Sequence, residues 1–383
     1  MPYPKVTVKV TNGNLLRSIT VEDGVGAIAA TVSTAALKGE TQQVYSLKDA
    51  VSKGYTEDAE PFMYKLIKEF YSELGGNMRL FVFGLAAETS MAEAVDSTNE
   101  QGLIKMLTAA GGDITLVALA RKPTDGYDAG AAFLDSDVSA TVTASLALCQ
   151  NMQQKNTPIR LLIEGRVANG AVANTFKPSE GSNGYAAVVL GGTSNDGSAA
   201  VSVALARACK YGAHIKIGSG QNGALSAVSQ VYIGNDRIED RLDMETLHDD
   251  GFLTFQVRAG AAGYYFGRDN MCSSDDYSIL VHGRIIDKAT RVIAAAYLPY
   301  IEDIIHLNSD GSIDALDAQN LENVLGTAIN ANMGEQISDS KVVIDTNQNI
   351  VNTSKLEVGC RILPLGYSTW INVTLGLTAQ TAE

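Results

Sequence analysis

Glycine-rich segments are the part of this sequence whose spacing could most readily support chemistry. Gly218–Gly223 reads GSGQNG, a literal match to the GxGxxG pattern whose backbone amides hold the pyrophosphate of a dinucleotide. That function requires a strand directly before the motif and a helix directly after it. Only the short run His214–Ile217 precedes the motif, which lies past the middle of a chain with 36 glycines. We therefore predict an ordinary loop.

Two further segments resemble ligand-binding loops and lack decisive residues. Gly191–Ser198 lies between a predicted strand and a predicted helix, without the lysine that a P-loop places against phosphates. We expect Ser198 to cap the helix that follows. Asp345–Asn349 resembles the start of a calcium loop, but Ile350 and Leu356 stand where glycine and a bidentate glutamate are needed. A polar turn between two strands is the prediction there.

The remaining polar residues form no recognisable catalytic set. The four histidines, His214, His248, His282 and His306, lack the spacing of metal ligands, and no GxSxG nucleophile elbow occurs. The acidic stretch 236–250 is interrupted by arginines, which is typical of a solvated or subunit-facing surface. The sequence therefore predicts no catalytic residues, no cofactor-binding residues and no metal ligands.

Composition narrows the class of protein. The 29 Lys and Arg against 43 Asp and Glu give a net charge of −14, which disfavours nucleic acid and anionic membranes as partners. Four cysteines lie dozens of residues apart with no CxxC pair, as expected for free buried thiols in a reducing compartment. No apolar run approaches the roughly 18 residues of a membrane span, and the N-terminus does not resemble a signal peptide. We expect a soluble protein made in the cytoplasm.

The elements that position these residues predict an α/β (α+β) fold with helices packed on mixed sheets, plus extended strand arms at both ends. Four zones are expected: 1–35, an N-terminal arm with the first strands; 36–225, an α/β domain; 226–366, a C-terminal core domain; and 367–383, a C-terminal strand arm. The main predicted strands are 79–83, 114–119, 159–163, 185–190, 253–257, 341–345, 354–362 and 369–377, and the main predicted helices begin at Pro61 or span 91–107, 131–153, 199–211, 284–306 and 314–332.

Both ends of the chain carry amphipathic strand patterns. Val6, Val8 and Val10 would share one face of the first strand. In the last strand, Trp370 would face away from Ile371, Val373, Leu375 and Leu377. Such strands need a sheet to join, either in the same chain, as an ordinary edge strand, or in a neighbouring copy.

The order of segments over about 130 residues of the C-terminal third resembles contractile tail sheath proteins of phages and the related sheaths of pyocins and type VI secretion systems. The segments are GFLTF (251–255), GYYF (263–266), GRIIDKA (283–289), the paired-helix region to Asn332, VVID (342–345) and the strand around Trp370. The N-terminal half matches only in general plan. Asp23–Gly26 lacks the proline of the Pro-Gly-Val opening that many sheaths carry.

This resemblance implies a structural polymer. Sheath subunits stack as hexameric rings around an inner tube, add their terminal strands to neighbouring subunits, and contract to drive the tube through a target envelope. Its implied partners are further copies of the chain, a tail tube protein, and baseplate and tail terminator proteins, with no cofactor. It implies a virion tail or injection particle assembled in the bacterial cytoplasm. The helix 314–332 is the expected tube-facing element.

Two other functions compete with this interpretation. One is an α/β enzyme that binds a nucleotide or sugar phosphate at its glycine-rich loops. The other is a different self-assembling shell or tube protein with similar terminal arms.

Overall fold

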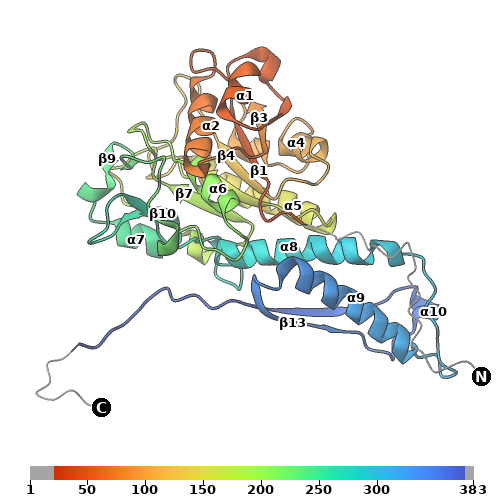
Figure 1. Ribbon diagram of the computed structural model, residues 1–383. Helices are drawn as coiled ribbons and strands as arrows, with labels where there is room; N and C mark the ends of the chain where they lie inside the picture. The colour runs from red at the N-terminus through yellow and green to blue at the C-terminus, as the bar shows by residue number, and fades with distance from the viewer. Residues whose placement is uncertain (1–20, 376–383) are drawn as a thin grey trace, which may run out of the picture.

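The computed structural model describes residues 21–375. Figure 1 shows a larger upper part above a smaller lower layer. We call the upper part, residues 21–279, the body, and the lower layer, residues 280–364, the C-terminal module. The segment 365–375, which follows the last strand and leaves the module, is the C-terminal arm.

An eight-stranded sheet in the order β11-β10-β7-β5-β4-β1-β3-β2 forms the centre of the body. Neighbours from β10 to β3 pair in parallel, whereas β10–β11 and β2–β3 pair antiparallel at the edges. β1, β3, β4 and β7 are mainly apolar and buried along their length, as expected where helices cover both faces. The predicted α/β class with a mixed sheet is confirmed. The strands are β1 (Gly26–Thr31), β2 (Thr41–Val44), β3 (Leu80–Leu85), β4 (Leu116–Ala120), β5 (Arg160–Glu164), β7 (Ala186–Leu190), β10 (Leu253–Val257) and β11 (Tyr264–Phe266).

Two groups of helices cover this sheet. The first group, α2 and α6, packs together and against β1, and the second group, α3 and α5, includes contacts with β5 and β7. In α2 the sequence sets both ends, because Pro61 occupies the first turn and Gly75 ends the helix with a left-handed φ of 72°. The helices of the body are α1 (Leu47–Ser52), α2 (Pro61–Leu74), α3 (Met91–Ala94), α4 (Leu103–Ala109), α5 (Ser136–Gln154), α6 (Val201–Lys210) and α7 (Met244–Asp249).

The predicted helix over 91–107 is wrong, since the structure divides it into α3 and α4. Between them the Asp96 carboxylate accepts hydrogen bonds from the amide and the hydroxyl of Thr98, at 2.8 Å each. Such a local bond offers the backbone an alternative to the helix. Two small sheets complete the body, one of β6 (Ser182–Asn183) with β12 (Cys272–Ser273) and one of β8 (Tyr232–Ile233) with β9 (Asp236–Arg237).

The sheet crosses two of the expected zone boundaries. β1, which falls within the expected opening zone 1–35, lies inside the sheet between β3 and β4. β10 and β11 lie beyond the expected boundary at 225/226 and extend the same sheet. The boundary between the body and the C-terminal module lies after the expected boundary at 225/226, between β12 and the first helix of the module.

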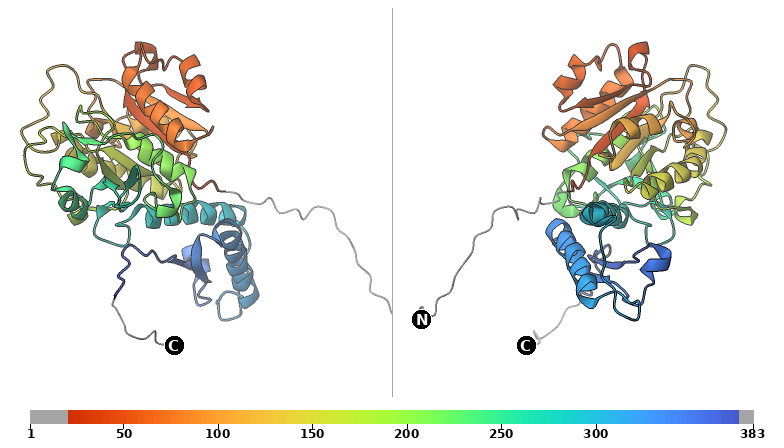
Figure 2. Two further views of the ribbon diagram at one scale, coloured as in Figure 1. Left: turned by 60° about the vertical axis from the view of Figure 1, so that its left-hand side comes forward. Right: turned by 90° about the vertical axis from the view of Figure 1, so that its right-hand side faces the viewer.

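The C-terminal module consists of two long helices and a two-stranded antiparallel sheet. α8 (Leu280–Tyr297) is seen nearly end-on in the right panel of Figure 2, between the body and α9 (Ala315–Met333). α9 matches its prediction, with Asp314 as the N-cap. α8 ends before the predicted His306, because a 3₁₀ turn at Leu298–Tyr300 contains Pro299. The remaining elements are β13 (Ile337–Val343), α10 (Ile350–Thr353) and β14 (Gly359–Pro364).

Candidate functional site

Buried carboxylates occupy the backbone amides that would otherwise offer anion sites in the body. Each of four acidic side chains accepts hydrogen bonds from two main-chain amides. Amides bonded to a carboxylate in this way are not available to an anionic ligand. Burial raises the pKa of the Glu164 carboxyl. The pairs are Glu60 with the amides of Ser33 and Thr34, Glu73 with Ser226 and Ala227, Asp137 with Met91 and Ala92, and Glu164 with Arg121 and Ala199.

Neither glycine-rich segment has the context of a nucleotide site. Gly218–Gly223 forms a loop with a 3₁₀ turn at Gly220–Asn222, as predicted, and no strand directly precedes it. Gly191–Ser198 does connect β7 to α6, but the Ala199 amide that follows donates to Glu164 at 3.2 Å. The expected N-cap is wrong, because α6 begins at Val201 and Ser198 instead donates to Asp196.

The other polar segments also keep structural roles. The Asp345 carboxylate accepts from the Asn347 amide at 2.9 Å, which makes a local turn. In the acidic stretch, Arg241 pairs with Asp236 and with Asp243. Within residues 21–375, no group of three or more His, Cys, Asp or Glu side chains is arranged to hold a metal ion. Over the same range, no helix has the length and apolar character required to cross a membrane.

A polar stripe on α8 joins the C-terminal module to the body. Arg284, Asp287, Lys288 and Arg291 are spaced i, i+3, i+4, i+7 and therefore share one face of the helix. Asp287 receives two hydrogen bonds of 2.7 Å from the guanidinium of Arg160 at the start of β5. Both side chains are buried. Although burial opposes the charge, Asp287 holds the pKa of Arg160 above its ordinary value.

The arginines of this stripe cap carbonyl groups of the body. Arg284 donates to the carbonyls of Ala208 at 2.7 Å and Tyr211 at 3.0 Å, at the end of α6. Arg291 donates to Ile114 and Pro158, each at 2.9 Å. Burial lowers the pKa of both guanidinium groups. Their bonds reach the end of α6 and the residues just before β4 and β5, so α8 is fixed to three segments of the body at once.

Gly283 makes this contact possible. A Cβ atom at this position would lie 2.7 Å from the guanidinium carbon of Arg160. Only glycine lets the helix approach the buried arginine this closely. In the sequence, the segment 283–289 stood out only for its resemblance to sheath proteins. The signal that could have shown a junction between two layers is the set of four charged residues on one face of this helix.

The small sheet of the C-terminal module is covered on one face only. Alternate residues of β14 are partly buried and exposed, and Cys360 and Ile362 pack with Val342 against the core of α8 and α9. Within residues 21–375, β13 and β14 pair only with each other, so each strand has an open edge. A two-stranded sheet of this kind is marginal alone, and its open edges can accept further strands.

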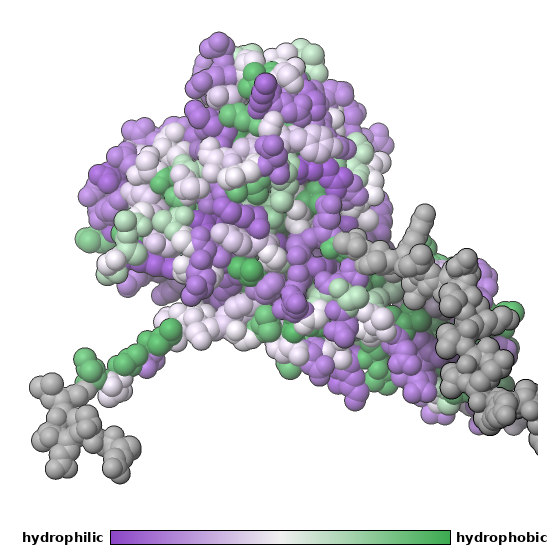
Figure 3. Space-filling view, viewed as in Figure 1, coloured by the Kyte–Doolittle hydropathy of each residue, from purple (hydrophilic) through white to green (hydrophobic). Residues whose placement is uncertain are grey.

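The C-terminal arm begins with an anchored tyrosine and continues as exposed apolar chain. The Tyr367 hydroxyl donates to the His214 carbonyl at 2.7 Å, and the Lys216 ammonium lies 5.0 Å from the centre of its ring. Beyond it, no strand is assigned up to residue 375. Figure 3 shows the hydrophobic run of the arm outside the body. The exposed fractions are 75% for Trp370, 78% for Ile371, 80% for Val373 and 94% for Leu375.

Not all predicted contact residues can be placed. Val6, Val8, Val10 and Leu377 lie outside the described residues. The four arm residues that are described pair with no strand within residues 21–375, so their pairing with a neighbouring copy remains a prediction.

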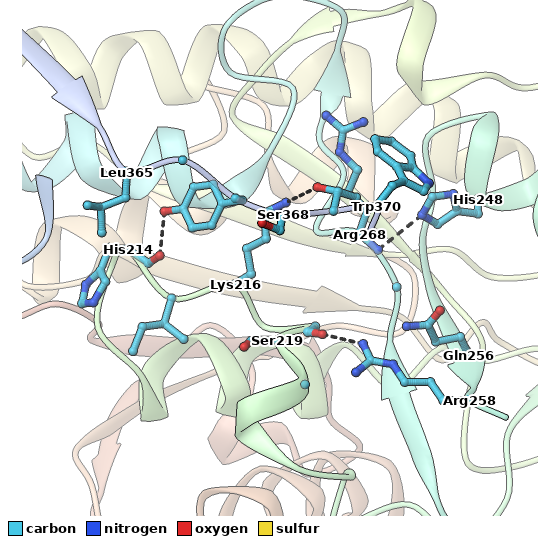
Figure 4. Close-up of a pocket in the computed structure, with 17 residues that line it drawn as sticks. His214, Lys216, Ser219, His248, Gln256, Arg258, Arg268, Leu365, Ser368 and Trp370 are labelled. Atoms are coloured by element: carbon cyan, nitrogen blue, oxygen red, sulfur yellow. Dashed lines mark hydrogen bonds between the residues drawn. The ribbon is translucent and has the colours of Figure 1, made fainter. Parts of the chain in front are cut away.

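A basic groove lies between the arm and the body (Figure 4). Its volume is about 710 Å³, and its lining includes Lys216, Arg258, Arg268 and Trp370. The structure also brings His214 and His248 to this groove, although they are 34 positions apart in the sequence (248 − 214). No local sequence pattern links these residues, because they come from five separate segments of the chain.

Comparisons with known proteins agree on the fold. The family models DUF2586, N-terminal domain, and DUF2586, C-terminal domain, match residues 3–270 and 276–382. No curated protein sequence matches the chain. The helical sheath of the anti-feeding prophage in its contracted state superposes with a TM-score of 0.64 at 14% identity, covering 99% of this chain and 100% of that chain.

Two further solved structures give the same result. The sheath complex of PVC, an extracellular contractile injection system, in its contracted state has a TM-score of 0.64 at 11% identity, covering 99% of this chain and 98% of that one. A sheath tail protein from Desulfitobacterium hafniense has a TM-score of 0.53 at 11% identity, covering 95% and 100% of the two chains. The chain therefore has the fold of contractile sheath proteins, as the resemblance in its C-terminal third implied.

Proposed function

This chain belongs to the DUF2586 family, and from that premise we propose that it is the structural subunit of a contractile sheath. The observation that carries the proposal is the superposition on a contracted helical sheath over 99% of this chain. The subunit polymerises around an inner tube and contracts to drive that tube through a target envelope. Its work is mechanical, and it is not an enzyme.

Strand exchange at the two ends is the proposed means of assembly. The open edges of β13 and β14 offer unpaired main-chain groups, and the C-terminal arm offers an extended apolar segment. An arm from one subunit would add to the small sheet of a neighbour, with Ile371, Val373 and Leu375 on one face. Val6, Val8 and Val10 would act in the same way at the other end.

The partners follow from this role. Copies of the chain stack as hexameric rings, with a tail tube protein inside and baseplate and tail terminator proteins at the ends. α9 is the proposed tube-facing helix. The particle is a phage tail or a phage-derived injection system, with kinship to pyocin and type VI secretion sheaths, and it is assembled in the bacterial cytoplasm without nucleic acid or membrane.

The enzyme alternative loses its support at the glycine-rich loops. Glu164 occupies the amide at the start of α6, and the Gly218–Gly223 loop opens no helix of useful length. We therefore expect no rise in melting temperature with nucleotides or sugar phosphates. A shift that grows with ligand concentration would revive the enzyme.

Electron microscopy of the purified protein tests the sheath. We expect hollow striated cylinders or stacked rings, and a discrete monomer or dimer under all conditions would contradict the proposal. The double substitution Ile371→Asp and Val373→Asp should abolish polymers while leaving the melting temperature unchanged, because both side chains are exposed in the subunit.

Leu242→Asp is the matched control, since Leu242 is even more exposed than Ile371 and Val373 but lies on the body. This variant should polymerise normally. Deletion of residues 1–14 tests the other arm and should also remove polymers without unfolding the body. Polymers that persist in either arm variant would show that the arm assignment is wrong.

A further inference from the structure

We propose that the basic groove of one subunit binds the exposed acidic segment Leu298–Ile304 of a second copy of the chain. The contact would be head-to-tail and separate from the strand exchange described above. It deepens the proposed function, on which it rests, by naming a second contact between subunits.

The groove holds positive charge that the subunit does not neutralise. Lys216 lies 3.9 Å from the buried carboxylate of Asp269. Within residues 21–375, by contrast, neither Arg258 nor Arg268 forms an ion pair with a carboxylate, and the buried Nε of Arg268 has no hydrogen-bond partner. In a chain with a net charge of −14, such a cluster favours an acidic ligand.

Apolar surface borders these cations. Trp370 is 75% exposed where the arm borders the groove, and Figure 4 places its ring beside His248. Large aromatic side chains next to arginines are the residues that contribute most to protein interfaces. The groove therefore fits a peptide that carries both carboxylates and apolar side chains, rather than a simple anion.

The segment Leu298–Ile304 has this chemistry. All seven residues, LPYIEDI, are exposed, and Glu302 and Asp303 form no ion pair within residues 21–375. Its large apolar residues have exposed fractions of 67% for Leu298, 40% for Tyr300, 67% for Ile301 and 80% for Ile304. An exposed apolar cluster of this density is typical of an interaction site.

Two backbone features restrict the conformation of this segment. Pro299 fixes its own φ, and Glu302 adopts a left-handed φ of 63°, which is uncommon for a residue other than glycine. Pro299 thus restricts the free segment, which lowers the entropic cost of binding.

One chain cannot make this contact with itself. The arm that borders the groove lies near the start of α8, where the rings of His282 and Tyr367 are 6.3 Å apart, whereas the segment directly follows the end of α8. The 18 residues of α8 separate the two sites by about 27 Å. A contact between different patches on two copies produces a ring or a helical filament.

Charge reversal with rescue tests the proposal in the full-length chain. We expect Arg258→Glu with Arg268→Glu, and separately Glu302→Arg with Asp303→Arg, to reduce assembly at least tenfold, measured by sedimentation velocity and electron microscopy. Combining all four substitutions in one chain should restore assembly, because every contact regains opposite charges. Glu57→Lys with Asp58→Lys reverses another exposed acidic pair, on the body, and should leave assembly unchanged.

The outcomes separate this proposal from the sheath itself. If the charge-reversal variants still form cylinders like the wild type, the groove contact is overturned and the proposed sheath stands. The same holds if the fourfold combination does not restore assembly. Short oligomers that respond to reversal and rescue support the groove contact and overturn the sheath. Monomers at all concentrations overturn both. If the groove variant melts early, the segment variant alone decides, because Glu302 and Asp303 are exposed.

Discussion

The body and the C-terminal module use their strands in opposite ways. In the body, β4 and β7 are buried at every residue, and the carboxylates at the sheet's margin are bonded to main-chain amides. In the module, β14 alternates between partly buried and exposed residues, and both strands keep an open edge. The central strands of the body are thus covered within one chain. In the module, main-chain groups of the strand edges and apolar side chains of the arm remain uncovered within residues 21–375.

The two regions meet along α8, and breaking that junction should have the largest effect. Asp287→Ala leaves the buried Arg160 without its carboxylate, which costs about 3–5 kcal/mol. We expect a lower urea midpoint and separate unfolding of the module and the body. The control Asp339→Ala removes an exposed carboxylate on β13 and should change stability by less than about 0.5 kcal/mol. Equal effects of the two substitutions would mean that the ion pair does not hold the layers together.

Truncating a core side chain in each region sharpens the contrast. Leu325 in α9 and Leu162 in β5 are both fully buried. Leu325→Ala should cost about 2–3 kcal/mol, at the low end of the range for such changes, because a thin layer can settle around the cavity. Hydrogen exchange should then rise in α9 and β13 but not in β4 or β5, and Leu162→Ala should give the reverse. A rise across both regions in either variant would show that they unfold as one unit.

A cap at the start of α9 should have a smaller effect. Asp314 accepts hydrogen bonds from the amides of Leu316 at 2.9 Å and Asp317 at 3.4 Å. Asp314→Ala should cost about 1 kcal/mol, and Asp314→Ser should recover most of it. Thermal unfolding of the three proteins measures this. If serine gives no recovery, the hydrogen bond is not what stabilises the helix.

Thiol reactivity should distinguish the regions without changing stability. In the body, burial raises the pKa of Cys149, Cys209 and Cys272 to about 12, so their thiolates are scarce at pH 8. Cys360 in β14 is only partly buried. Native protein should therefore label at one site, lost in Cys360→Ser, and denatured protein at four. Rapid labelling of the body cysteines would contradict its closed core.

The sequence predicted the parts of the fold that depend on local pattern. β5 and β7 lie within one residue of their predicted ranges, and so does α9, because continuous apolar runs and an N-cap aspartate mark them. The side-chain pairs that join the body to the C-terminal module could not be predicted from the sequence. Arg160 and Asp287 are 127 positions apart, and no local pattern links them. The sheet crossed the expected boundary at 225/226 for the same reason, since strand order is a long-range property.

The candidate site also has one part that the sequence could predict and one part that it could not. The exposed arm residues Trp370 to Leu375 could be proposed from alternation alone, and their pairing remains a prediction. The groove could not be foreseen, because the chain folds back to bring residues near 216, 258 and 268 together. Its histidines looked isolated in the sequence for that reason.

The polar stripe of α8 has a consequence for how the subunit would transmit force. A pull on the module would reach the body through Arg284, Asp287 and Arg291, which contact three separate segments of the body. Bonds arranged side by side along an axis share a shear load and must fail together, whereas bonds in series fail one at a time. In the proposed sheath, the body and the module would therefore move together as one stiff unit under load.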